Sequence, residues 1–148
     1  MRDTRFIARH RGGPLSKEHH RLLAAWAADC AERLLEIFET HSADERPRRA
    51  IEAARSWSRA EVPAGVSMKA AVAAHAAARE TKHPAAVAVA RAAGHAAATA
   101  HAADHCLGVA IYGRKAVDPD VWESERSWQI QKVPAELRGL IVSALEVR

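Results

Sequence analysis

Three histidines lie within the stretch GHAAATAHAADH, residues 94–105, which otherwise consists almost entirely of alanine. His101 and His105 are one helical turn apart and lie about 40° from each other around a helix axis. His95 lies about 120° from His101 and about 80° from His105 by the same geometry. We therefore expect His101 and His105 to share a site and His95 to point elsewhere.

The helix face that carries this pair is polar, whereas the opposite face is apolar. Its members are Val87, Arg91, Gly94, Ala98, His101, His105, Gly108 and Tyr112. Glycines on such a face let another group approach the backbone closely. We predict that Arg91, His101, His105 and Tyr112 line a polar cleft.

Three interpretations of the histidine pair follow from its chemistry. The two imidazoles can be structural and hydrogen-bonded within the fold. They can instead begin a metal site, because the His-x-x-x-His spacing suits zinc, with His75 as the third ligand. The third interpretation is a pocket for a partner side chain or a small ligand. Two ligands one turn apart make an incomplete zinc site, so we expect no metal and no other cofactor.

Motifs of the common enzyme classes are missing from the sequence. It contains no GxSxG, phosphate-binding loop or dinucleotide fingerprint. Cys30 and Cys106 are not in a CxxC or zinc-type spacing, and both lie on apolar helix faces. We expect them to be buried free thiols in a reducing cytoplasm. A metal-dependent helical enzyme that uses His101, His105 and His75 stays open as an alternative.

Alanine accounts for 35 of the 148 residues, and 20 of these lie between Ala70 and Ala110. Because alanine is the best helix former, the composition predicts an all-α protein. Residues 1–15 are expected to form an extended basic arm, and residues 16–148 a single compact domain of about six helices. The predicted helices are 17–40, 47–60, 68–80 with Ser67 as its cap, 84–117, 119–131 and one that begins at Pro134. The longest, alanine-rich helix 84–117 is expected at the centre.

The chain carries a net charge of +4, and its basic residues are scattered rather than clustered. The densest groups are Arg2, Arg5, Arg9 and Arg11 at the N-terminus and the run of Arg46, Arg48 and Arg49. This pattern argues against nucleic acid as the main partner, although a nucleic-acid-binding helical domain stays as a second alternative. No apolar run is long enough for a membrane span and no signal peptide is recognisable, so we expect a cytoplasmic protein without a membrane partner.

Four ordered phrases connect the sequence to a known family. They are GGPLSKEHHRLLAAWAADCAERLL, RPRRAIEAARSWSR, ARAAGHAAATAHAADHCLGVAIYGRKAV and ERSWQIQKVPAELRGLIV. Together they resemble the bacterial Imm-5-like immunity proteins from about residue 12 to residue 145. The resemblance implies an all-helical, non-enzymatic protein that binds and neutralises a toxin. The candidates for a common binding surface within these phrases are Arg46, Arg48, Trp57, Arg91, His101, His105, Trp128 and Gln129.

The charge of the chain constrains what kind of toxin such a protein would bind. Inhibitors of nucleases are commonly acidic, because they complement a basic cleft. A basic chain therefore argues against a nuclease partner. The one acidic concentration comprises Asp118, Asp120, Glu123, Glu125 and Glu136. This face is the alternative binding surface if the histidine pair belongs to the core.

Overall fold

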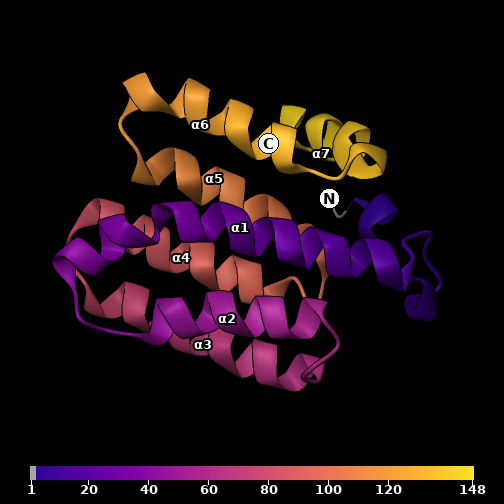
Figure 1. Cartoon of the computed structure of the whole chain (residues 1–148), viewed down its shortest axis with the longest axis horizontal. Helices are drawn as coiled ribbons and strands as arrows, with labels where there is room; N and C mark the ends of the chain where they lie inside the picture. Colours follow the sequence, from indigo (N-terminus) through magenta and orange to yellow (C-terminus); the bar gives the residue numbers. More distant parts are fainter. Residues whose placement is uncertain (1–2) are drawn as a thin grey trace.

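The computed structural model describes residues 3–148, and this part of the chain is all-α (Figure 1). It contains seven α-helices and no strand. Their bounds are α1 (Lys17–His41), α2 (Arg46–Ser58), α3 (Ala64–Glu80), α4 (Pro84–Ala98), α5 (Cys106–Ala116), α6 (Pro119–Lys132) and α7 (Ala135–Glu146). Three short 3-10 turns are η1 (Thr4–Phe6), η2 (Arg9–Arg11) and η3 (Ala103–His105). The predicted all-α fold class is confirmed.

The long helix α1 forms because its apolar residues recur at helical spacing behind a good N-cap. The Ser16 hydroxyl accepts a hydrogen bond from the backbone N–H of His19 at 3.1 Å. Leu23, Leu34 and Phe38 are almost completely buried. Burying side chains of this size contributes roughly 1.5–3 kcal/mol each. This apolar stripe thus attaches α1 to the core.

The helix α4 is the centre of the domain and contacts α1, α2, α3 and α5. Its buried side chains are nearly all alanines, with Val89 as the largest. Such small side chains allow neighbouring helices to approach on several sides. In Figure 1, α6 and α7 lie on one side of α1 and α5, and α2 and α3 lie on the other. The predicted packing around an alanine-rich helix is therefore confirmed.

The predicted helix 84–117 is wrong, because the chain breaks between α4 and α5. The Ser67 hydroxyl donates a hydrogen bond to the carbonyl of Ala97 at 2.7 Å. The His20 Nε2 donates to the carbonyl of Thr99 at 2.5 Å. Carbonyls at a helix end must find partners outside the helix, and here side chains of α3 and α1 supply them. The Thr99 hydroxyl also donates to the carbonyl of His95 at 3.0 Å.

This role of Ser67 also corrects the expected start of the third helix. The helix α3 begins at Ala64, one turn before the predicted start, and Ser67 lies inside it. Ser67 has no exposed surface, because its hydroxyl faces α4 and not the first turn of its own helix. It is an interhelical contact and not an N-cap.

The N-terminal segment is more compact than an extended arm, although Arg2 lies outside the described residues. The turns η1 and η2 fold the segment back on itself, and the backbone N–H of Arg9 donates to the carbonyl of Leu15 at 2.9 Å. Phe6 and Leu15 are buried in the main core. These two apolar side chains hold the segment against the helices. Among the described residues, no helix is long and apolar enough to cross a membrane.

Candidate functional site

Three histidines from different elements come together beside α4, and we call this group the histidine cluster. Its members are His75 on α3, His95 on α4 and His105 on η3. The His95 Nδ1 lies 3.2 Å from the His105 Nδ1. The ring centroids of His75 and His95 are 5.3 Å apart, in an edge-on arrangement. The pairing is therefore His95 with His105.

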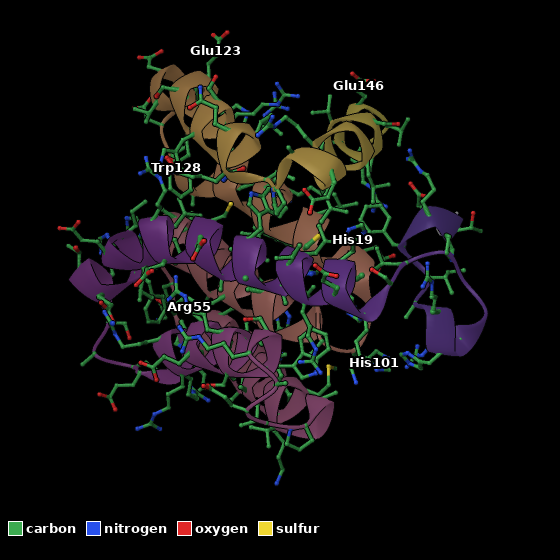
Figure 2. The ribbon with its side chains drawn as sticks, turned by 45° about the vertical axis from the view of Figure 1, so that its right-hand side comes forward. His19, Arg55, His101, Glu123, Trp128 and Glu146 are labelled. Atoms are coloured by element: carbon green, nitrogen blue, oxygen red, sulfur yellow. The ribbon has the colours of Figure 1, made fainter. Side chains whose placement is uncertain are left out.

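The expectation that His101 shares a site with His105 and that His95 points elsewhere is wrong. His101 is exposed on the turn that follows α4 (Figure 2). The wheel geometry fails because the helix ends at Ala98, so residues 95, 101 and 105 are not on one helix. The break turns His105 back toward the side chain of His95.

Two glycines make room for the imidazoles. A Cβ atom on Gly94 would lie 2.6 Å from the His75 Nε2. A Cβ atom on Gly108 would lie 2.5 Å from the His95 Cγ. Both distances are far below van der Waals contact, so any larger residue would displace a ring. The prediction that these glycines admit a close neighbour is confirmed, and the neighbours are histidine rings.

His75 and His95 are uncharged near pH 7. The Arg91 guanidinium donates to the His75 Nδ1 at 2.9 Å, which requires this nitrogen to be unprotonated. Burial, and then the nearby Arg91 charge, lower the pKa of His75. Burial lowers the pKa of His95 to about 4, and the neighbouring His105 and His75 act in the same direction. Of the two Nδ1 atoms of His95 and His105, one therefore donates and the other accepts.

A polar pocket of about 360 Å³ opens beside the histidine cluster. Its lining is His95, Asp104, His105, Gly108, Ile111, Tyr112 and Arg148. The Tyr112 ring stacks on His95 with centroids 5.2 Å apart, and the Lys115 ammonium lies 5.0 Å from the Tyr112 centroid. The pocket thus offers hydrogen-bond donors and acceptors to a polar group. Of the predicted cleft residues, His105 and Tyr112 line this pocket. Arg91 instead contacts His75 in the adjacent histidine cluster, and His101 belongs to neither.

The structure does not assemble the metal ligands that the sequence offered. Within residues 3–148, no group of three His, Cys, Asp or Glu side chains is arranged to hold a metal ion. His101 is exposed on its turn and lies outside the histidine cluster that contains His75 and His105. The alternative of a metal-dependent enzyme therefore has no ligand set among these residues.

The predicted site residues on α6 have structural contacts of their own. The Trp128 ring lies under the Arg33 guanidinium, 4.1 Å from its carbon, and Arg33 forms a bidentate ion pair with the buried Glu125. Gln129 is buried, and its main-chain carbonyl accepts a hydrogen bond from the Trp26 indole at 2.8 Å. Figure 2 shows Trp128 and His101 on opposite sides of α1. The candidates for a common binding surface are therefore distributed over separate parts of the domain.

Arginines near the start of α2 are engaged with carboxylates. Arg46 pairs with Asp44 at 2.7 Å and with Glu80 at 2.9 Å. Arg48 pairs with Glu39 at 2.6 Å. Their charges are largely compensated within the fold, which weakens the case for Arg46 and Arg48 as phosphate contacts in the nucleic-acid alternative.

A second pocket, of about 640 Å³, lies where the N-terminal segment, α1 and the α2–α3 turn meet, and we call it the basic pocket. Its lining is Ala8, Arg9, His10, Lys17, His20, Arg21, Trp57, Val62, Pro63 and Ala64. Of the predicted site residues, Trp57 alone lies here. The His20 and Trp57 rings pack with centroids 4.7 Å apart, and the Arg21 guanidinium carbon lies 4.8 Å from the Trp57 ring centroid.

The basic pocket is not predicted from the sequence, because residues 8–21 form it together with Trp57 and residues 62–64, which are remote in the chain. Only the density of Arg9, His10, Lys17, His20 and Arg21 within a short stretch pointed to it. A basic stretch by itself does not distinguish a solvated surface from the wall of a pocket.

A family model described as "Imm-5 like putative immunity protein" matches residues 13–136. The chain belongs to this family. No curated protein and no solved structure matches it. The residues that match this immunity-protein family include the whole histidine cluster and all of α1 to α6. The part of the N-terminal segment that contributes Ala8, Arg9 and His10 to the basic pocket precedes the match.

Proposed function

We propose that this protein is an immunity protein that binds a toxin protein and neutralises it by occupying part of its surface. The observation that carries the proposal is the family match over residues 13–136. It agrees with the resemblance of the four ordered phrases in the sequence. The mode of action we propose is stoichiometric binding, without chemical change to the toxin.

The chemistry of the described side chains supports binding rather than catalysis. Burial raises the pKa of both thiols, Cys30 and Cys106, so that they are protonated and enclosed in the core. The low pKa of His95 makes it a weak base. Buried free thiols also fit a reducing compartment, and we place the protein in the cytoplasm.

The charge of the chain supports a partner with an acidic contact surface. The net charge is +4, and association is favoured when the two surfaces carry opposite potentials. A toxin whose functional cleft is basic would be repelled. We therefore favour a toxin that exposes carboxylates over a nuclease with a basic cleft.

Co-expression with a candidate toxin, sought among the products of the neighbouring genes, tests the proposal. Cells that express the toxin alone should stop growing, and cells that also express this protein should grow. An unrelated small helical protein at the same level is the control and should not protect. If this protein gives no protection and does not co-purify with any neighbouring gene product, the proposed function is wrong.

A further inference from the structure

We propose that the basic pocket is the docking site for an acidic segment of the toxin, with a carboxylate among Arg9, Lys17 and Arg21 and an apolar neighbour against Trp57. The identity of the partner as a toxin rests on the proposed function. The preference of the pocket for an acidic protein segment rests on its own lining and can be tested separately.

The charge of the lining is the first observation. All five ionisable residues of the lining are of basic type, and no Asp or Glu contributes to it. Within residues 3–148, Arg9, Lys17 and Arg21 form no ion pair with a carboxylate. Elsewhere on the surface arginines such as Arg55 are paired with nearby carboxylates. The basic pocket therefore concentrates positive charge that the fold itself does not neutralise.

The second observation is that Arg21 and Trp57 hold each other in place. One N–H group of Arg21 donates to the main-chain carbonyl of Trp57, and the guanidinium lies over the indole ring. Trp57 is only 7% exposed, and the ring of His20, which is 3% exposed, packs against the Trp57 ring. A guanidinium that is already ordered loses little side-chain entropy on binding an anion.

The third observation concerns His20 and the first turn of α3, which both contribute to the lining of the pocket. The His20 Nε2 is committed to the Thr99 carbonyl, and burial lowers the pKa of His20, so its Nδ1 can accept a hydrogen bond from a peptide N–H. Ala64 is the first residue of α3 and Pro63 is its N-cap residue, which provides no side-chain cap. The positive dipole end of α3 therefore adjoins the pocket. Both features suit a peptide that carries a carboxylate.

A protein segment fits this pocket better than a nucleic acid does. Trp57, Val62 and Pro63 provide an apolar wall, which a phosphate backbone would not use. The basic residues at the start of α2 are paired with carboxylates, so they do not extend the pocket into a longer phosphate track. Arg9 and His10 precede the family match, and we expect these two residues to influence which toxin the pocket accepts.

The test uses two exposed cations of the pocket and two matched cations at the far end of α3. The pocket variant combines Arg9→Glu with Lys17→Glu. The control variant combines Arg79→Glu with Lys82→Glu, which gives the same change in net charge. All four side chains are exposed, and none forms an ion pair within residues 3–148. Since α3 starts at the pocket and ends at Glu80, the control lies about 25 Å away along the helix.

The first measurement is the dissociation constant for the toxin. The pocket variant should bind at least about tenfold more weakly than the wild-type protein, whereas the control should change by less than about threefold. Equal binding by the pocket variant and the wild-type protein would refute the docking site and leave the proposed function standing.

The second measurement needs no toxin. A short soluble peptide with four Glu residues and one Leu among Gly and Ser is titrated into the ¹⁵N-labelled protein and followed by NMR. Saturable shifts should appear at Arg9, Lys17 and the Trp57 indole, and they should vanish in the pocket variant and with a Gln-for-Glu peptide. Shifts elsewhere, no shifts, or stronger shifts of these residues with a single-stranded oligonucleotide would refute the inference. Peptide binding without any toxin binding would refute the proposed function alone.

Discussion

Replacing Gly108 by alanine should destabilise the protein, although alanine is the better helix former. The new Cβ atom would lie 2.5 Å from both the Cγ and the Nδ1 of His95 and 3.0 Å from its Cβ. The His95 ring cannot turn away freely, because Tyr112 stacks on it and His105 lies within hydrogen-bond distance. The clash must therefore move a ring or a helix.

The size of the effect follows from two opposing terms. Overpacking a filled site costs roughly 1–3 kcal/mol. Replacing glycine by alanine in a helix contributes at most about 1 kcal/mol of stability. With the full helix gain, the net loss from these two terms is about 0–2 kcal/mol.

Gly139 provides the matched control, because its Cβ would meet no atom within 4 Å. Gly139→Ala lies in α7 and should stabilise the protein by roughly 0.5–1 kcal/mol. Urea unfolding followed by circular dichroism at pH 7 gives the free energy of unfolding for both variants. If Gly108→Ala is as stable as Gly139→Ala, the His95 ring does not pack on Gly108 and the histidine cluster is wrongly described.

Three further changes test other parts of the fold. Ser67→Ala removes the donor to the Ala97 carbonyl and should lower the free energy of unfolding by roughly 1–3 kcal/mol in urea titrations; an unchanged value would show that this contact does not hold the end of α4. Because the pKa of His95 is about 4 in the folded state and about 6.5 when unfolded, the unfolded chain takes up the proton first as the pH falls. Stability that is present above about pH 6.5 is therefore lost towards pH 4, by about 2 kcal/mol between pH 7 and pH 5, and His95→Gln should reduce this slope. Ala60 has a φ of 62°, so Ala60→Gly should raise the urea midpoint by the equivalent of roughly 0.5–1 kcal/mol, and a lowered midpoint would contradict strain at this turn.

Helices with local start signals were predictable from the sequence. Ser16 caps α1, and Asp118 caps α6 by accepting a hydrogen bond from the backbone N–H of Asp120. Proline begins α6 and immediately precedes α7. Such signals act within one turn of the chain, so a sequence pattern contains all the information they need.

The break after α4 was not predictable in this way. The run of residues 95–103 contains no glycine or proline, and alanine favours continued helix. The helix ends where two remote side chains bond to carbonyls at its end. Ser67 donates to the carbonyl of Ala97, and His20 donates to the carbonyl of Thr99. The histidine cluster depends on that break. Only Gly94 and Gly108 indicated that something large would lie against these helices.

The central claim, neutralisation by binding, is tested most directly by titrating a fixed amount of purified toxin with this protein and measuring residual toxin activity. A binder should reduce the activity linearly to zero near a one-to-one molar ratio, without dependence on incubation time, and the activity should return when the two proteins are separated under denaturing and refolding conditions. Loss of toxin activity at far below one equivalent, growing with time and persisting after separation, would show that the protein acts as an enzyme on the toxin and would contradict the account.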